Sequence, residues 1–241
     1  MKILLSNDDG YYASGIQSLI NELSVAHDIF VAAPSVNQSA GSSALSVRKD
    51  ILVENVSKNH YIIDGTPADC VHIALTCLIK EEIDIVVSGI NLGANLGDDV
   101  IYSGTVAAAL EGRHLKMSPI AISLMSSVNM DIKKSAKVSK KIIDEITSNK
   151  TIYKNTLLNV NIPDISKNLD ISDIEYTRLG ARDLPLPATK IINKSDYYRI
   201  GGAGIPKDNG KKTDFYAIEN NKISISPILY DYTNNNILEK L

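Results

Sequence analysis

Short apolar runs alternate with stretches of helical periodicity along most of the chain. A continuous run of about five apolar residues is typical of a strand that is buried on both faces. Apolar residues at spacings of three and four predict an amphipathic helix instead. The expected strands are residues 2–6, 28–33, 51–56, 61–63, 84–88, 120–123 and 157–162. The expected helices are residues 15–26, 66–80, 105–115 and 131–148.

This alternation predicts an α/β fold. Strands joined by helical crossovers form a mostly parallel sheet with helices on both faces, as in Rossmann-like proteins. Such sheets bind ligands at the carboxyl ends of their strands. Two polar loops are expected at that edge, residues 34–46 after the second strand and the glycine-rich residues 89–103 after the buried strand at 84–88.

The pattern degrades after Pro163. Residues 164–241 hold short segments that could pair as hairpins, and no clear helix precedes Asn234. We therefore expect residues 1–163 to form a Rossmann-like catalytic core. Residues 164–241 are expected to form a C-terminal, hairpin-rich arm that completes the same domain.

Composition excludes several classes of protein. The 25 Lys and Arg residues are balanced by 28 Asp and Glu, a net charge of −3, whereas proteins that bind nucleic acid polymers carry a concentrated basic face. No apolar run approaches the roughly 20 residues of a membrane span. The first residues lack the features of a secretory signal, so a cytoplasmic location is expected. Cys70 and Cys77 are too far apart on one helix for a disulfide and are expected to be buried free thiols.

The first strand ends in Asn7-Asp8-Asp9-Gly10. Gly10 permits a sharp turn, so both carboxylates could converge, and they would repel each other unless a cation intervened. A plain turn is the alternative interpretation, because Asn, Asp and Gly all favour turns for local reasons. Residues 37–43 and 88–97 add neutral oxygen groups at the same sheet edge. Together the three loops predict a hard oxygen site suited to Mg²⁺ or Mn²⁺.

A second feature is Ser103-Gly104-Thr105, which opens a helix. Free N–H groups and hydroxyls at a helix start bind phosphate, although simple N-capping explains the same residues. Thr66 and Asp69 resemble a capping box, so Asp69 is given no catalytic role. The sequence lacks G-x-S-x-G, the P-loop motif and G-x-G-x-x-G after the first strand. These absences disfavour an α/β-hydrolase, a P-loop NTPase and a dinucleotide dehydrogenase.

These motifs, in this order, resemble the SurE family, the survival proteins that are metal-dependent nucleoside monophosphate phosphatases. The resemblance covers about the first 125 residues, with weaker similarity later. The distinctive matches are residues 3–10, 34–39, 65–70 and 88–112, and the weaker ones are residues 158–163 and 223–227. Residues 40–46 follow the family loop only loosely.

The resemblance implies a set of site residues. One divalent ion, Mg²⁺ or Mn²⁺, would be held by four positions, and the first two are also the catalytic pair. The metal-binding residues are Asp8, Asp9, Ser39 and Asn91. The phosphate-binding residues are Asn95, Ser103, Gly104 and Thr105.

The implied reaction is hydrolysis of nucleoside 5′- and 3′-monophosphates to nucleoside and phosphate. The implied assembly is a homodimer or homotetramer built through the arm, without nucleic acid or membrane partners. Two alternatives stay open. The same site could serve an exopolyphosphatase or a broad small-phosphomonoester hydrolase, or the chain could be a nucleotide sensor without catalysis.

Overall fold

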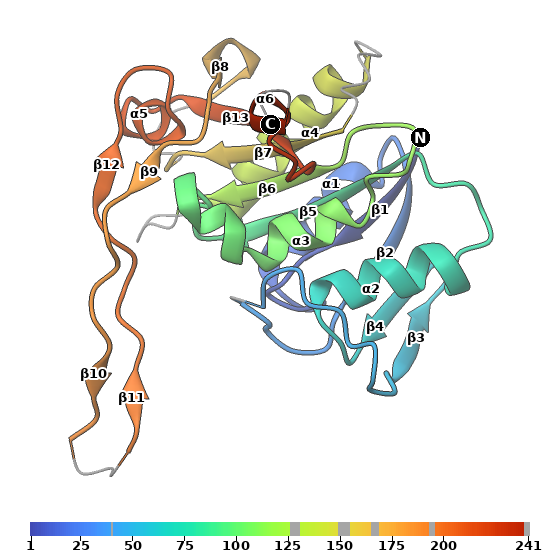
Figure 1. Ribbon diagram of the computed structural model, residues 1–241. Coiled ribbons are helices and arrows are strands. Elements are labelled where there is room, and N and C mark those ends of the chain that lie inside the picture. Colours follow the sequence, from blue (N-terminus) through green and yellow to red (C-terminus); the bar gives the residue numbers. More distant parts are fainter. Residues whose placement is uncertain (40, 126–130, 149–154, 165–168, 193–195, 239–241) are drawn as a thin grey trace.

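The computed structural model describes residues 1–39, 41–125, 131–148, 155–164, 169–192 and 196–238. Its centre is a nine-stranded sheet within these residues (Figure 1). The strands of this sheet are β1 (Lys2–Ser6), β2 (Asp28–Pro34), β3 (Val53–Ser57), β4 (His60–Ile63), β5 (Ile85–Leu92), β6 (Ile120–Leu124), β7 (Thr156–Ile162), β8 (Ile174–Tyr176) and β13 (Ile223–Leu229). Their order in space is β3-β4-β2-β1-β5-β6-β7-β13-β8.

The sheet confirms the mostly parallel α/β architecture. The strands from β4 to β7 run parallel, and Ile3 of β1 lies opposite Ile29 of β2 and Ile85 of β5. Strand β3 is antiparallel to β4, and β13 is antiparallel to β7. Because β13 and β8 both come from the segment after residue 163, that segment forms part of the central sheet in addition to an arm.

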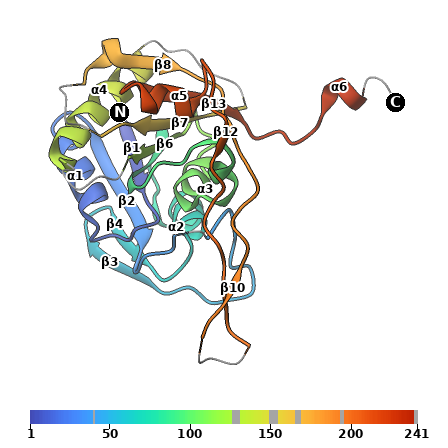
Figure 2. The same cartoon turned by 90° about the vertical axis from the view of Figure 1, so that its left-hand side faces the viewer.

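Helices cover both faces of the sheet (Figures 1 and 2). The helical elements are α1 (Ser14–Leu23), α2 (Pro67–Ile73), η1 (Ala74–Leu78), η2 (Gly97–Tyr102), α3 (Gly104–Leu110), α4 (Ile132–Ser148), η3 (Ile171–Asp173), α5 (Asp214–Glu219) and α6 (Asn235–Leu238). Helices α1 and α4 pack together on one face, and α2 and α3 on the other. Side chains alternate along β1, so Ile3 and Leu5 face the first pair and Leu4 the second. None of the helices in the described ranges is long and apolar enough to span a membrane.

Several element boundaries differ from the prediction, and those of β5 and α3 lie next to the polar loop at residues 89–103. Strand β5 continues to Leu92, where the sequence predicted a loop, and its pairing with β6 shifts register between Ser88 and Asn91. Gly89, with φ +142°, lies in this irregularity, and a bulged strand with a glycine resembles a loop in sequence. The helix expected to reach residue 115 ends at Leu110, shortly before Gly112, because glycine is a poor helix former.

The first part of the expected helix at residues 66–80 is confirmed, and its capping box is present. The hydroxyl of Thr66 accepts a hydrogen bond from the Asp69 N–H, and Asp69 accepts one from the Thr66 N–H at 2.9 Å. Burial raises the pKa of Asp69, but hydrogen bonds from Ser46 and Thr66 outweigh burial and hold the pKa below its usual value. Asp69 is therefore committed to this structural role.

The prediction for the cysteines is half right. Both are free, and burial raises the pKa of the Cys70 thiol, but Cys77 is exposed. After α2 the helix changes to π geometry, with the Ile79 N–H bonded to the Ala74 carbonyl. The wider turn rotates the following residues out of phase with α2, so a position seven residues after Cys70 no longer shares its face.

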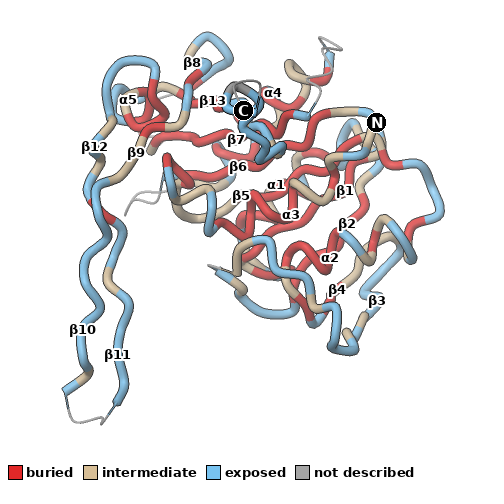
Figure 3. Tube along the Cα trace, in the orientation of Figure 1, coloured by how far each residue is buried: buried red, intermediate tan, exposed pale blue. Residues whose placement is uncertain are grey.

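The predicted hairpin arm is present and projects from the body (Figures 1 and 2). It consists of β9 (Ala181–Arg182) paired with β12 (Pro206–Asp208), and β10 (Thr189–Lys190) paired with β11 (Tyr198–Arg199). Much of the hairpin is exposed (Figure 3). Helix α5, which the sequence did not predict, follows the hairpin; it is only six residues long, too short for helical periodicity to show.

Candidate active site

The two adjacent carboxylates lie at the carboxyl end of β1, as predicted. Gly10 has φ +105°, and the side chain of Asn7 closes the turn by donating to the Gly10 carbonyl at 2.9 Å. Asp8 is buried and Asp9 is half-buried. The turn and the acidic site are therefore the same feature: the turn brings both carboxylates to one edge of the sheet.

Asp8 lies against the start of α3. The Thr105 hydroxyl donates to Asp8 Oδ1 at 2.6 Å, and a Cβ placed on Gly104 would lie 2.8 Å from the Asp8 Cβ. Burial raises the pKa of Asp8; the Thr105 hydrogen bond opposes this, and the charge of Asp9 adds to it, with a net rise. The sequence prediction placed Thr105 on the phosphate, whereas the structure shows its hydroxyl bonded to Asp8.

Asp9 is held by the two neighbouring loops. The Asn37 amide donates to Asp9 Oδ1 at 3.2 Å, and the Leu92 N–H donates to Asp9 Oδ2 at 3.4 Å. Burial raises the pKa of Asp9 in spite of these two bonds. The loop after β2 is also attached to the turn directly, because the Gln38 N–H donates to the Asp8 carbonyl at 2.7 Å. Three loops thus meet at one edge.

Ser39 and Asn91 belong to these same two loops. Ser39 is exposed, and its N–H donates to the Asn37 side chain at 2.9 Å. The Asn91 side-chain amide donates to the Gly93 carbonyl at 2.7 Å, which uses its nitrogen and leaves its oxygen as an acceptor. Both residues thus lie in the loops whose Asn37 and Leu92 bond Asp9, and their role as metal ligands stays a prediction.

The donor chemistry of this edge fits a hard divalent cation. Among the described residues, neither Asp8 nor Asp9 forms an ion pair with a Lys, Arg or His. In the same ranges no three His, Cys, Asp or Glu side chains cluster as a metal site, and the donors that this edge offers are the carboxylates of Asp8 and Asp9 and the neutral oxygens of its polar loops. Such an all-oxygen set suits Mg²⁺ or Mn²⁺. A cation would also relieve the cost of burying two like charges.

Asn95 and Ser103 lie at either end of the segment that contains η2. The Ser103 hydroxyl accepts from the Val106 N–H at 3.1 Å, so it caps α3 as expected. Asn95 is buried, and its amide nitrogen donates to the Ser123 hydroxyl at 2.8 Å.

Sequence reasoning missed several residues that support this site. Asn37 lies in the predicted polar loop at residues 37–43 but was not singled out as a site residue. Asn159 and Asn161 are fully buried on β7 and bond to the Asn95 backbone. The available signal was two polar residues at alternate positions of an otherwise apolar strand, which places both on one face. Asp214, at the start of the unpredicted α5, gave no such signal.

Known proteins resemble this chain along its whole length. A family model described as "Survival protein SurE" matches residues 3–185. The "5'-nucleotidase SurE" of Vesicomyosocius okutanii subsp. Calyptogena okutanii (strain HA) is 48% identical over 236 residues, which cover 98% of this chain and 94% of that protein. The protein of the same name from Legionella pneumophila (strain Lens) is 44% identical over 243 residues, covering 100% and 96%. The crystal structure of the SurE protein from Aquifex aeolicus superposes with a TM-score of 0.85 at 34% identity, covering 100% of this chain and 98% of that one.

Proposed function

The chain belongs to the SurE family, and from this we propose that it is a 5′-nucleotidase, a phosphoric monoester hydrolase that releases phosphate from nucleoside 5′-monophosphates. The observation that carries the proposal is the meeting of Asp8, Asp9 and the start of α3 at one sheet edge. We extend the proposal to nucleoside 3′-monophosphates, which present the same phosphate ester to that edge.

The proposed metal ligands are Asp8, Asp9, Ser39 and Asn91. A bound Mg²⁺ or Mn²⁺ would neutralise phosphoryl charge and lower the pKa of water towards neutrality. The chain prepares the site beforehand: the Thr105 hydroxyl fixes the Asp8 carboxylate, while the Asn37 amide and the Leu92 N–H fix that of Asp9. Partners of this kind keep ligand oxygens oriented, which strengthens binding.

The proposed phosphate contacts are Asn95, Ser103, Gly104 and Thr105. Ser103 uses its hydroxyl oxygen as an acceptor for the Val106 N–H, so its hydrogen is available to a phosphate oxygen. Gly104 has no side chain, so α3 can begin against Asp8. Because the Thr105 hydroxyl already bonds Asp8, Thr105 would contact phosphate through its backbone. Fixed donors of this type stabilise the charge that develops on the transferring group.

A phosphate-release assay tests this function. We expect nucleoside 5′-monophosphates to release phosphate with Mn²⁺ or Mg²⁺, to lose that release in EDTA, and to regain it when one divalent metal is added back. Polyphosphate and sugar phosphates at matched metal concentration serve as comparison substrates. Preferred turnover of polyphosphate would identify an exopolyphosphatase instead, and tight nucleotide binding without phosphate release would identify a sensor. Release that EDTA leaves unchanged would contradict the metal assignment.

We also propose that the hairpin arm joins copies of this chain into a homodimer or homotetramer. Its apolar side chains lie in solvent: Leu184 is 85% exposed, Ile200 89% and Ile205 75%. Exposed apolar residues gathered on one projecting element are typical of an association surface.

Ile200→Asp is expected to weaken this assembly at least about tenfold, because it places a charge in an apolar contact. Sedimentation velocity over a range of protein concentrations would measure the shift towards monomer. Val25→Asp is the matched control: Val25 is 83% exposed on the body, far from the arm in sequence, and its replacement should leave sedimentation unchanged. A wild-type monomer, or an Ile200→Asp protein that assembles normally, would contradict the proposal.

A further inference from the structure

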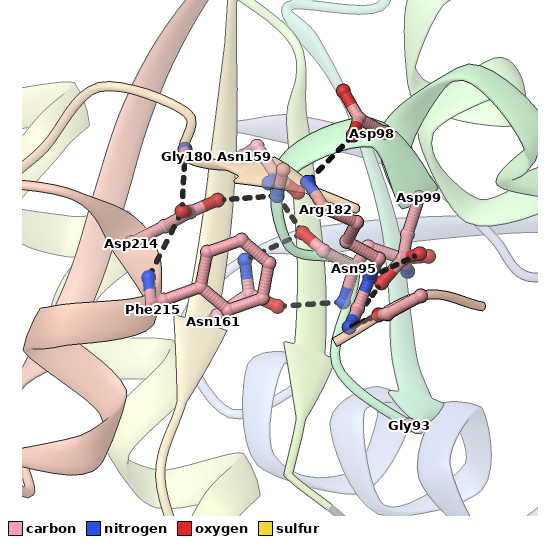
Figure 4. A network of polar contacts seen from close by, with 12 residues as sticks. Gly93, Asn95, Asp98, Asp99, Asn159, Asn161, Gly180, Arg182, Asp214 and Phe215 are labelled. Atoms are coloured by element: carbon pink, nitrogen blue, oxygen red, sulfur yellow. Dashed lines mark hydrogen bonds and ion pairs between the residues drawn. The ribbon is translucent and has the colours of Figure 1, made fainter. Parts of the chain in front are cut away.

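The segment between β5 and α3, residues 93–103, carries Asn95 and Ser103 and is called the phosphate loop below. Only its first residue continues the sheet pairing, through the Gly93 N–H bond to the Leu124 carbonyl. Beyond that point, residues of β7, α5 and the base of the arm bond to the loop (Figure 4). These residues lie 64 to 117 positions away from their loop partners in sequence.

Two asparagines hold the backbone of Asn95. Asn161 accepts from the Asn95 N–H at 2.8 Å and donates to the Asn95 carbonyl at 3.0 Å, so one amide pairs with both groups of that residue. Asn159 donates to the same carbonyl at 2.9 Å. Both asparagines are fully buried on a strand of the central sheet. Asn95 is therefore fixed in position and orientation by a rigid element.

Asp214 holds the next turn of the loop. This fully buried carboxylate accepts from the Gly97 N–H at 2.7 Å, and from the Gly180 and Phe215 N–H groups at 2.8 and 2.9 Å. The loop fits closely here: Gly97 has φ +52°, and a Cβ on it would lie 2.7 Å from the Phe215 ring. One side chain thus bonds to the phosphate loop, to Gly180 just before β9 of the arm, and to α5.

Arg182, the last residue of β9, binds the phosphate loop from the base of the arm. Its guanidinium forks onto both carboxylate oxygens of Asp99 at 2.9 and 2.6 Å, and its N–H donates to Asp98 at 2.7 Å. The guanidinium also lies 5.0 Å from the centre of the Phe215 ring. Bidentate pairs of this kind fix geometry as well as adding energy.

We propose that Asn161 and Asp214 are positioning residues for phosphate: they hold the phosphate loop so that Asn95 and Ser103 face Asp8. This inference rests on the proposed function. The carboxylates of Asp8 and Asp9 have separate supports in Thr105, Asn37 and the Leu92 N–H. Loss of the loop contacts should therefore reduce phosphate affinity and leave cation affinity unchanged, a separation that a general loss of structure would not produce.

The test uses Asp214→Asn and Asn161→Asp in the full chain. Asp214→Asn replaces one acceptor oxygen with a donor that opposes a backbone N–H. Asn161→Asp keeps the acceptor for the Asn95 N–H but sets an oxygen against the Asn95 carbonyl. We expect kcat/KM for a nucleoside 5′-monophosphate to fall by about 10- to 100-fold, as for other positioning partners. The inhibition constant of inorganic phosphate should rise at least about tenfold, while the Kd for Mn²⁺ stays within about twofold.

Asp208→Asn is the matched control. Asp208 is a carboxylate at the base of the same arm, but its side chain is 42% exposed and pairs with Arg178 rather than with the loop. Its replacement should leave all three constants unchanged. Amide hydrogen exchange in residues 93–103 adds a readout that does not need activity, and it should accelerate in the two test variants only.

Four results would overturn the proposal: unchanged phosphate inhibition in a folded Asp214→Asn or Asn161→Asp protein, unchanged exchange in the loop, equal losses of Mn²⁺ and phosphate affinity, or unfolding of both variants. If Asp214→Asn alone fails to fold, Asn161→Asp is interpreted in the same way. A wild-type protein that releases no phosphate from nucleotides would refute the proposed function instead, while the exchange measurement would still decide whether these side chains hold the loop.

Discussion

Asp8→Asn is expected to lower metal-dependent phosphate release by about 10²- to 10³-fold, the range found when one essential electrostatic group is removed from an active site. The substitution keeps the shape of the side chain, and its amide oxygen can still accept from the Thr105 hydroxyl, which lies 2.6 Å from Asp8 Oδ1. It removes the charge that the proposed cation needs. The loss should appear in kcat/KM for nucleoside 5′-monophosphates at saturating Mn²⁺.

Stability should change in the opposite direction in the absence of metal. Burial and the charge of Asp9 raise the pKa of Asp8, which means that the folded protein disfavours its ionised form. At neutral pH the ionised Asp8 therefore costs stability, and a neutral Asn removes that cost. Without divalent metal, the Asp8→Asn protein should unfold at the same temperature as wild type or at a higher one. Addition of Mn²⁺ should raise the unfolding temperature of wild type only.

Asp28→Asn provides the control for both measurements. Asp28 is exposed at the first position of β2, at the opposite end of the strands from Asp8. Its replacement makes the same chemical change without touching the acidic pair, so turnover and the response to Mn²⁺ should stay at wild-type values. Undiminished turnover in Asp8→Asn would refute the assignment of the site.

Local signals in the sequence were sufficient for strands β1 to β7 of the sheet, its helical layers and the acidic turn, but not for β8 and β13. Strand β1 was predicted with the bounds that the structure has, because the adjacent apolar residues Ile3, Leu4 and Leu5 stand between polar Lys2 and Ser6. The position of Asp8 and Asp9 followed from the same strand: in a parallel sheet, the residues after each strand gather at one edge. The capping box of α2 was readable for a similar reason, since Thr66 and Asp69 are three positions apart.

Features that depend on tertiary contacts were not predictable in this way. The hydrogen bond from the Gly97 N–H to Asp214 joins residues 117 positions apart. The sequence around either residue does not indicate the other as its partner. Thr105 lies in a helix start that suits phosphate, yet its hydroxyl bonds a carboxylate 97 positions away. The sequence therefore indicated which residues reach the edge, whereas their partners depend on how distant segments pack.

Gly104→Ala separates activity from stability at the start of α3. The backbone of Gly104 has no left-handed conformation, so alanine is compatible with it, and alanine in a helix gains up to about 1 kcal/mol over glycine. The new methyl group, however, would lie 2.8 Å from the Asp8 Cβ and 3.1 Å from Oδ2. Contacts this short force Asp8 or the first turn of α3 to move, and that displacement costs stability of similar size. We expect the free energy of unfolding to stay within about 1 kcal/mol of wild type.

Activity should not be preserved in the same way, because a displacement of about 1 Å at a reacting centre costs on the order of 100-fold in rate. We therefore expect kcat/KM of Gly104→Ala to fall by about 100-fold while urea unfolding stays nearly unchanged. Gly210→Ala is the matched control: a Cβ there meets nothing within 4 Å, so both quantities should equal those of wild type. Full activity in Gly104→Ala would show that the reaction tolerates movement of Asp8 against α3, and it would remove the contact between them from the proposed mechanism.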